Sequence, residues 1–323
     1  MTWGHHKPVE PARAEQVCDE RGLKRVRLDN SSIELEVMIH GGERSELPPL
    51  LIMNSIEFPM PPSPEFCDLM QDAGYQVIFV RRPGFGYTQS LPAALLSKQE
   101  TKRHAPIVTE AALIKRLIDT MGLNNIRLLG LGTSNSICRR LIQMGDEIDV
   151  CVFSNPLFNP EIWDVIRPAW LKRMIRQTVL SKSGLKIAVR GLRAVLRRDP
   201  IWFYHQFAQK SAGDLAYIKA NEADFRVAAQ FLQDLAPDVY FSELRSALIE
   251  DTEWTPDSLG TTNAVILSGH ETTTPWKASI AAEAKRLELP ISFANAGDLF
   301  VAYASPKTLI ELLETHAAKS AVL

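Results

Sequence analysis

The stretch that most constrains the fold is Ile126 to Leu141, where an apolar run meets a glycine-rich turn and then a second apolar run. The first run, I-R-L-L-G-L, is short and rich in large aliphatic residues, which predicts a buried strand. The run that begins at Ile137 has the spacing of an amphipathic helix. Because a buried strand that turns directly into a helix is the repeating unit of parallel sheets, the sequence predicts an α/β fold.

Short apolar runs and helical patterns alternate along most of the chain. We predict strands at 25–28, 33–39, 50–53, 76–80, 126–131, 150–153, 264–267 and 291–294. We predict helices at 66–72, 110–121, 137–144, 275–286 and 306–316. The alternation predicts one mostly parallel sheet with helices on both faces.

A long helical stretch interrupts this alternation, because strand patterns stop after Pro156 and return only at Ala264. One sheet with a helical insertion explains the order better than two consecutive domains do. The predicted units are a core of residues 24–156 and 259–323, a helical cap of residues 157–258, and an N-terminal extension of residues 1–23.

Charge and cysteine content narrow the function. The 36 Lys and Arg residues nearly balance the 38 Asp and Glu residues, so the overall charge gives no attraction to nucleic acid. The sequence shows neither an apolar leader nor a membrane-spanning run, which predicts a cytoplasmic location. The cysteines lack C-x-x-C spacing and are expected to be reduced thiols that bind no metal: Cys18, Cys67, Cys138 and Cys151.

Several stretches of the chain resemble the α/β-hydrolase fold family. P-P-L-L-I-M-N-S (48–55) is similar to its oxyanion strand, and G-Y-Q-V-I-F-V-R-R-P-G-F-G-Y-T (74–88) to its strand and P-G-F-G-x-S turn. Residues 124–156 resemble the nucleophile strand, elbow, helix and next strand, while 264–276 and 290–306 resemble the strands that carry the acid and the histidine. The resemblance covers about two thirds of the chain and implies the fold of that family.

The family's nucleophile elbow has the pattern G-x-S-x-G, a strained turn that exposes the serine oxygen. An alignment without a gap puts Gly130 at the first glycine, Gly132 at the nucleophile and Ser134 at the last small residue. The nucleophilic serine is therefore missing. Because glycine adopts positive φ at little steric cost, we expect the turn to persist with Gly132 at its tip and Ser134 in the first helical turn.

Two other interpretations of this turn exist. A shift of two residues makes Ser134 the nucleophile of an esterase-like serine hydrolase, at the expense of extra polar residues before the elbow and a shorter helix. The run G-L-G-T-S-N is also similar to a dinucleotide-binding fingerprint, but Asn135 replaces the third glycine and no acid ends the next strand. We therefore expect no cofactor.

The remaining triad positions that the resemblance implies also hold unexpected residues. The position of the acid is Thr272, with Glu271 one residue early, and the position of the histidine is Asp298. A carboxylate with an ordinary pKa near 3.9 is a poor base for a serine hydroxyl, whereas imidazole near 6.5 suits that role. Glu271 and Asp298 could form a carboxylate pair for acid–base chemistry, which leaves a non-hydrolytic enzyme as an alternative.

The resemblance also places Asn54 and Ser55 where the family has His-Gly, and the N–H of Ile56 where it would face an oxyanion. The favoured function is a pseudohydrolase that binds a small, mostly hydrophobic molecule. A hydroxyl or amine on the ligand is expected, because a carboxylate would meet the like charge of Asp298. The predicted pocket residues are Asn54, Ser55, Ile56, Gly132, Thr133, Thr272 and Asp298, with a roof of Trp163, Trp170, Trp202, Phe203 and Phe207.

The predicted cap carries a marked charge asymmetry. Between Val165 and Arg198 there are ten Lys or Arg residues and no acid. Five of them recur at helical spacing, which predicts a basic amphipathic helix: Lys182, Lys186, Arg190, Arg193 and Arg197. Binding to an anionic membrane surface is one interpretation. The sequence favours another, in which the ten acids of residues 201–257 pair with the basic face inside the cap or across a homodimer.

Overall fold

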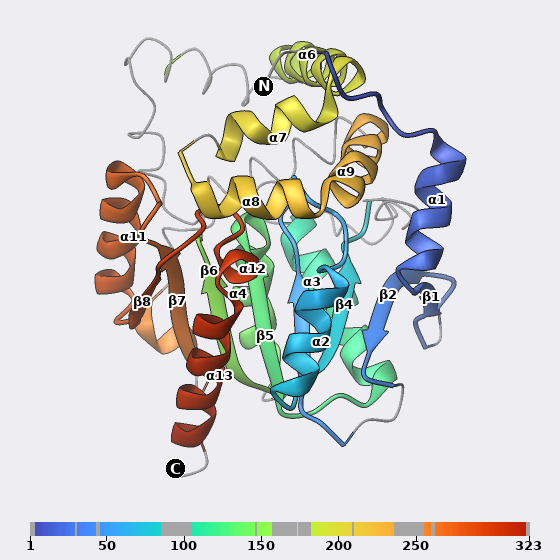
Figure 1. The fold of residues 1–323 in the computed structure, drawn as a ribbon. Helices are drawn as coiled ribbons and strands as arrows, with labels where there is room; N and C mark the ends of the chain where they lie inside the picture. The colour runs from blue at the N-terminus through green and yellow to red at the C-terminus, as the bar shows by residue number, and fades with distance from the viewer. Residues whose placement is uncertain are drawn as a thin grey trace.

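A single sheet runs through the molecule, and it contains eight strands in the described part of the chain (Figure 1). The computed structural model describes residues 4–29, 31–42, 46–84, 105–145, 147–156, 173, 182–208, 210–235, 255–259 and 262–320. The strands are β1 (Leu23–Arg27), β2 (Glu34–His40), β3 (Pro49–Met53), β4 (Gln76–Arg81), β5 (Ile126–Leu131), β6 (Ile148–Ser154), β7 (Asn263–Gly269) and β8 (Ile291–Ala294).

The strand order is β1-β2-β4-β3-β5-β6-β7-β8. Strand β2 pairs antiparallel with β1 and β4, and the strands from β4 to β8 are parallel. The predicted mostly parallel α/β sheet is confirmed. Every residue of the central strands β3, β4 and β5 is buried, because helices cover both faces of the sheet.

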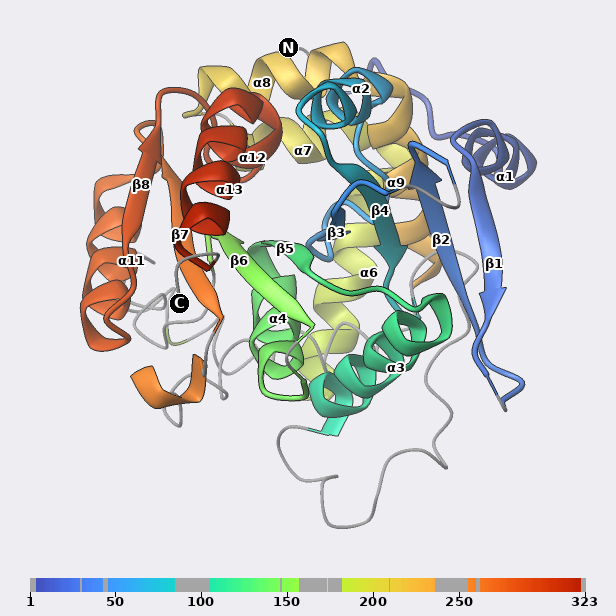
Figure 2. The ribbon, with the colours of Figure 1, turned by 90° about the horizontal axis from the view of Figure 1, so that it is seen from below.

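Helices form a layer on each face of the sheet (Figure 2). One layer contains α2 (Pro64–Asp72) and α13 (Pro306–Ser320), and the other contains α3 (Ala105–Met121), α4 (Asn135–Ile142) and α11 (Thr274–Arg286). Alternate residues of β3 point to the two layers: Leu50 and Ile52 belong to the first core cluster, Leu51 and Met53 to the second. The helix predicted from residue 110 begins earlier, at Ala105.

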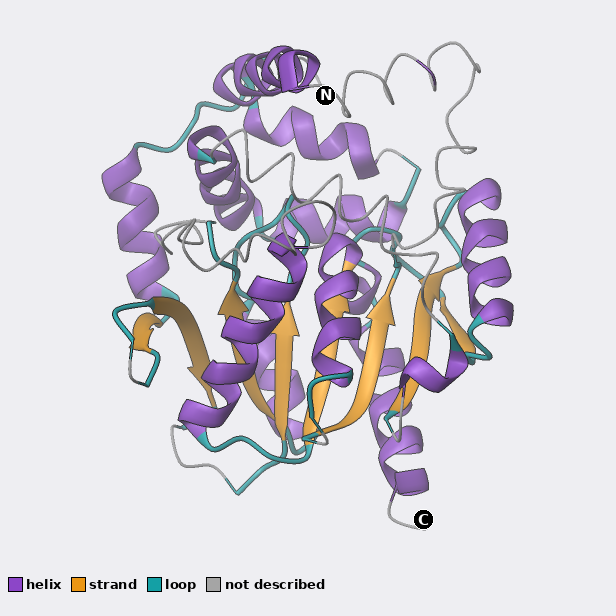
Figure 3. Cartoon of the chain, turned by 180° about the vertical axis from the view of Figure 1, so that it is seen from behind, coloured by secondary structure: helices purple, strands orange, loops and turns teal. Residues whose placement is uncertain are grey.

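Four helices of the described chain lie between β6 and β7, above the carboxyl ends of the strands (Figures 1 and 3). They are α6 (Lys182–Arg198), α7 (Pro200–Ala208), α8 (Ala212–Ala220) and α9 (Glu222–Asp234). We call residues 157–258 the insertion. No helix in the described ranges combines the length and the apolarity needed to cross a membrane.

The N-terminal segment contains a helix that the sequence patterns did not predict. Helix α1 (Pro11–Glu20) packs against α9 and β1 and buries Ala14, Val17 and Cys18. Arg21 then forms an ion pair with Asp224 of α9, at 3.2 Å. Residues 11–21 are thus part of the packed molecule. The helix was missed because its apolar positions are few and its partner lies some 200 residues away in the sequence.

Candidate functional site

The turn between β5 and α4 has the geometry expected from the gap-free alignment. Gly132 has a φ of 53°, in the left-handed region that favours glycine, and starts a short 3-10 turn that ends at Ser134. A Cβ on Gly130 would overlap the Sγ of Cys138, so close packing of α4 on β5 requires a glycine there. The prediction that Gly132 occupies the tip at positive φ is confirmed.

Ser134, the last residue of this turn, is fully buried and is not exposed at the tip. Its Oγ lies 2.7 Å from the carbonyl oxygen of Met53 and 2.9 Å from that of Leu131, and it accepts the N–H of Leu131 at 2.8 Å. The hydroxyl is therefore bonded to the backbones of β3 and β5. Asn135, whose role the sequence patterns did not reveal, donates from Nδ2 to the carbonyl oxygen of Gly132 at 2.8 Å.

Two backbone N–H groups lie beside the tip, and both already have partners. The N–H of Thr133 donates to Ser55 Oγ at 3.2 Å, and the N–H of Ile56 donates to Thr133 Oγ1 at 3.3 Å. All three residues are buried. In an α/β hydrolase, the oxyanion is bound by the amide after the nucleophile and by an amide of the loop that follows strand β3. In this chain that loop is residues 54–63, which we call the β3 loop. Here hydroxyl groups of the protein occupy the corresponding donors.

A carboxylate that the sequence patterns did not reveal ends this hydrogen-bond chain. Ser55 Oγ donates to a carboxylate oxygen of Glu57. Because the single Ser55 proton is committed there, the 3.2 Å bond between the Ser55 and Thr133 hydroxyls must use the proton of Thr133. The chain then runs from the Ile56 N–H through Thr133 and Ser55 to Glu57, with every hydroxyl both donating and accepting. We call these four residues the hydroxyl chain.

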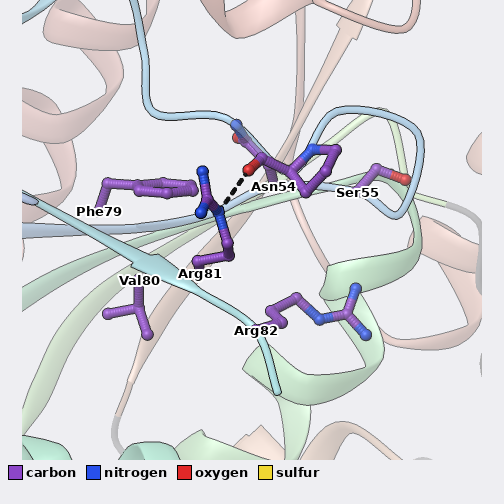
Figure 4. A pocket seen from close by; sticks show the side chains of 7 residues that line it. Asn54, Ser55, Phe79, Val80, Arg81 and Arg82 are labelled. Atoms are coloured by element: carbon purple, nitrogen blue, oxygen red, sulfur yellow. Dashed lines mark hydrogen bonds between the residues drawn. The ribbon is translucent and has the colours of Figure 1, made fainter. Parts of the chain in front are cut away.

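Asn54 faces a different neighbourhood from that of Ser55. Its Nδ2 donates to the carbonyl oxygen of Met60 at 2.5 Å, and its Oδ1 accepts the hydroxyl of Tyr303. A cavity beside Asn54 and Ser55 measures about 10 Å³, room for about one water. Figure 4 shows Arg81 turned toward the β3 loop, where its Nε donates to the carbonyl oxygen of Pro59 at 2.8 Å. Asn54 is therefore a structural residue of the loop.

On the other side of the tip, Asp298 follows β8 and is held by two side chains. Its Oδ1 accepts the hydroxyl of Thr272 at 2.8 Å and the Nδ2 of Asn155 at 2.7 Å. Its Oδ2 accepts no hydrogen bond within the described part of the chain. Burial raises the pKa of Asp298, and the bonds from Thr272 and Asn155 offset only part of that effect. The structure thus brings Thr272 and Asp298 together, as the resemblance implied.

Glu271 does not join Asp298 in a hydrogen-bonded pair, because its carboxylate is used elsewhere. Its Oε2 accepts Ser211 Oγ at 2.7 Å, the N–H of Gly213 at 2.9 Å and the N–H of Gly297 at 2.8 Å. Burial alone would raise the pKa of Glu271, but these donated bonds lower it below its ordinary value. Glu271 therefore fixes the start of α8 to the turn after β8.

A second carboxylate, Asp214 of α8, makes the reciprocal contact. It is fully buried, and its two oxygens accept the N–H groups of Asp298 at 2.9 Å, Leu299 at 2.8 Å and Phe300 at 3.1 Å. These amides precede α12 (Val301–Ala304). Burial raises the pKa of Asp214 to about 6. We call Asp214 and Glu271, together with the amides that they bind, the carboxylate clamp.

Glycines make the approach of α8 to this turn unusually close. A Cβ on Gly213 would overlap the backbone nitrogen of Gly297, and a Cβ on Gly269 would overlap its carbonyl oxygen. Gly297 itself has a φ of 93°. Three backbone segments, from α8, β7 and the loop after β8, therefore meet with no room for side chains.

No histidine in the described part of the chain hydrogen bonds to Ser134 or Asp298. His270 is exposed and stacks on Phe293, with ring centroids 5.5 Å apart. His205 of α7 is half-buried, and burial lowers its pKa. His104 lies outside the described residues, as do Trp163 and Trp170 of the predicted roof. The described ranges also hold no group of three side chains that could bind a metal ion.

Solved structures share the fold of this chain. A putative acyltransferase from Salmonella enterica matches with a TM-score of 0.63 and 15% identity over 92% of this chain and 95% of that chain. The enol-lactonase from Burkholderia xenovorans LB400 matches with a TM-score of 0.60 and 12% identity over 91% of this chain and 100% of that chain. MGS-M2, an α/β-hydrolase enzyme from a Medee basin deep-sea metagenome library, matches with a TM-score of 0.58 and 15% identity over 91% and 96%.

The fold is that of the α/β hydrolases. No family model and no curated protein matches the sequence. At identities this low, the likeness to the solved structures establishes the fold and leaves the chemistry to be argued from this chain's own residues.

Proposed function

We propose that the protein is a pseudohydrolase, which has the α/β-hydrolase fold and binds a small molecule without hydrolysing it. The hydroxyl chain carries this proposal. An oxyanion hole works because its N–H groups are preorganised and free to bind the charge that develops in the transition state. In this chain the amides of Thr133 and Ile56 donate to hydroxyls of the protein instead.

The positions of a nucleophile and a base support the same conclusion. Gly132 has no side chain at the tip, and the Ser134 hydroxyl is buried in bonds to Met53 and Leu131. A nucleophilic serine needs a base within hydrogen-bond reach, and none of the partners of Ser134 is a base. An esterase that uses Ser134 would first have to rebuild the turn.

The environment of Asp298 supports the proposed ligand class. One of its oxygens is held by Thr272 and Asn155, while the other has no partner in the described chain. Nearby aromatic rings pack between the β3 loop and the insertion, with centroid distances of 4.4 Å for Phe58–Phe225 and 5.1 Å for Phe225–Phe300. These rings are buried in the core, and the open carboxylate oxygen of Asp298 is what favours a ligand with a hydroxyl or an amine over an acid.

A fluorophosphonate probe tests the absence of hydrolysis, because it labels only activated serines. We expect no labelling of the folded protein and no turnover of short p-nitrophenyl esters above the rate in buffer. An active esterase serves as the positive control, and mass spectrometry locates any label. Labelling at Ser134, with ester turnover that disappears in Ser134→Ala, would overturn the proposal in favour of a serine hydrolase.

A thermal-shift screen tests the ligand class with matched alcohols, amines and acids on the same apolar scaffolds. A ligand at a hundred times its Kd stabilises the folded state by about 2.7 kcal/mol. We expect alcohols or amines to stabilise the wild type and the surface control Asp119→Asn equally, and Asp298→Asn less. If acids stabilise most and Asp298→Asn changes nothing, the ligand class is wrong.

A non-hydrolytic acid–base enzyme is the second candidate, and the raised pKa of Asp298 favours it. Glu271 contributes less to this alternative, because three donors hold its carboxylate and lower its pKa. Chemical conversion of a stabilising ligand by the wild type, and its loss in Asp298→Asn with binding retained, would favour this candidate over simple binding.

A further inference from the structure

Helix α6 presents an uninterrupted basic face to solvent. Lys186, Arg190 and Arg197 are exposed and lie within one third of the helix circumference. A neighbouring side of the helix is buried through Val189 and Leu196. The sequence from Lys182 to Arg198 contains no acidic residue, so no neighbour on the same helix neutralises this face.

The pairing that the sequence favoured for this helix is not seen for these three side chains. None of them makes an ion pair or hydrogen bond within the described part of the chain. Arg193, nearer the buried side, instead donates to the carbonyl oxygen of Leu235 at 2.8 Å. Among the described residues, these three cations thus have no acidic partner, although the helix that carries them packs against α7 and α9.

An exposed aliphatic residue flanks the cations. Ile187 has 68% of its surface accessible, the largest value among the exposed large hydrophobic residues of the described chain. Helix α6 lies on the far side of α7 from the sheet, at the outer end of the molecule (Figures 1 and 3). The basic face and Ile187 can therefore meet a flat surface together.

We propose that α6 docks the protein on an anionic lipid surface, with Lys186, Arg190 and Arg197 at the lipid phosphates and Ile187 in the headgroup region. Charge complementarity selects an anionic partner, and Ile187 selects one that can also take up an aliphatic side chain. Nucleic acid offers no such uptake, and the chain as a whole has a net charge of −2. The proposal does not depend on whether the hydrolase-like site binds a ligand.

Sedimentation with lipid vesicles tests this docking. The full-length protein is mixed with phosphatidylcholine vesicles that contain either no anionic lipid or one third phosphatidylserine. We expect binding only to the anionic vesicles, and a steep loss of binding as salt is raised, because salt screens surface charges. The triple variant Lys186→Gln, Arg190→Gln, Arg197→Gln should partition about 100-fold more weakly, at about fivefold for each cation.

Matched variants separate this face from general charge. The control Arg25→Gln, Lys285→Gln, Lys307→Gln removes three exposed cations elsewhere and should bind vesicles like the wild type. Ile187→Ser should weaken binding about fivefold with its salt dependence unchanged, because it removes only apolar contact. Circular dichroism and the melting temperature establish that each variant is folded.

Several outcomes would overturn the proposal. One is equal binding to neutral and anionic vesicles, and another is equal loss of binding in the two triple variants. A third is the absence of sedimentation with anionic vesicles, combined with a gel-mobility shift of an RNA or DNA duplex by the wild type that the α6 triple variant does not cause. That result would assign the basic face to nucleic acid. None of these measurements uses esterase substrates or pocket ligands, so they stand apart from the tests of the proposed function.

Discussion

The two sides of the hydrolase-like site are held by different chemistry. On the β5 side, the hydroxyls of Thr133 and Ser55 relay hydrogen bonds from the N–H of Ile56 to the carboxylate of Glu57. On the β7 and β8 side, the carboxylate clamp joins Asp214 of α8 to the amides of residues 298–300, and Glu271 to Ser211, Gly213 and Gly297.

The difference lies in what each side depends on. The hydroxyl chain links two loops at neighbouring strands of the core, β3 and β5, which pair directly. The carboxylate clamp links the core to the insertion, and the backbone of Asp298 is bonded to α8. The insertion therefore holds the backbone of Asp298 through the Asp214 carboxylate. In the described residues, its hydrogen bond to the hydroxyl chain is that of the Tyr204 hydroxyl to the carbonyl oxygen of Glu57, at 2.7 Å. The four predictions that follow test this asymmetry.

The largest effect is expected from Asp214→Ala, which leaves one buried and two half-buried N–H groups without their acceptor. We expect the free energy of unfolding to fall by about 4 kcal/mol. Each unsatisfied donor costs about 1–3 kcal/mol, and movement of residues 298–300 toward other partners recovers only part of that cost. Urea denaturation measures the loss. Hydrogen exchange should accelerate at residues 298–300 and stay unchanged at Thr133.

The control for this change is Asp224→Ala, which removes another buried carboxylate of the insertion, one that pairs with Arg21. It should lower stability without altering exchange at residues 298–300. If both variants accelerate exchange there equally, α8 does not position Asp298 and the asymmetry between the two sides fails.

The second prediction concerns pH. The pKa of Asp214 is raised to about 6 in the folded protein, so between the unfolded value of 3.8 and about 6 the folded state binds a proton that the unfolded state does not. The free energy of unfolding of the wild type should therefore fall as the pH rises through this window. Asp214→Asn lacks the titration, so the stability difference between the two proteins should change by up to about 3 kcal/mol.

Urea denaturation at pH 4, 5, 6 and 7 measures this difference. The variant should lose the most at pH 4 and gain relative to the wild type by pH 7. Asp298 faces Asp214 and has a raised pKa itself, so the window belongs to the pair. Glu271 titrates in both proteins, and its contribution largely cancels. A pH-independent difference would mean that Asp214 has the same pKa in the folded and unfolded states, against the raised value given above.

The two sides of the site also differ in how far the sequence predicted them. The turn was predictable because its signal is local: two glycines two residues apart, after an aliphatic run and before a helical pattern. Glycine at the tip predicted the positive φ of Gly132 correctly. The sheet was predictable for the same reason, since each strand is a continuous run bounded by turn residues.

The carboxylate clamp could not have been predicted from local patterns. Asp214 binds residues about 84 positions further along the chain. In the sequence it is an ordinary acid in the first turn of a helix, after the N-cap Ser211. Asn155 and Glu57 are equally inconspicuous loop residues. Their roles depend on the docking of the insertion and of the β3 loop, which no spacing within either segment records.

Gly213→Ala sharpens the comparison through packing alone. In an exposed helix this change stabilises by about 0.5–1 kcal/mol, because alanine has the higher helix propensity. At residue 213 the new methyl group would overlap the backbone of Gly297, so α8 must shift away. We expect a loss of about 2 kcal/mol, comparable to other cases of overpacking.

The matched control is Gly191→Ala in α6, where nothing lies within 4 Å of the added Cβ. Thermal denaturation should show a stabilised Gly191→Ala and a destabilised Gly213→Ala. Two stabilised variants would indicate that α8 approaches the turn less closely than the glycines imply.

The smallest expected effect is that of Gly132→Ser, which restores the serine of the family pattern at the tip. Gly132 has a φ of 53°, and a non-glycine residue in the left-handed region costs about 1–2 kcal/mol. The new hydroxyl would still lack a base with an ordinary pKa near neutrality. The amides of Thr133 and Ile56 would still donate to Ser55 and Thr133. We therefore expect a folded protein, slightly less stable in urea, that a fluorophosphonate probe does not label. Efficient labelling at residue 132 would show that the hydroxyl chain opens readily, and that the missing serine alone separates this chain from an active hydrolase.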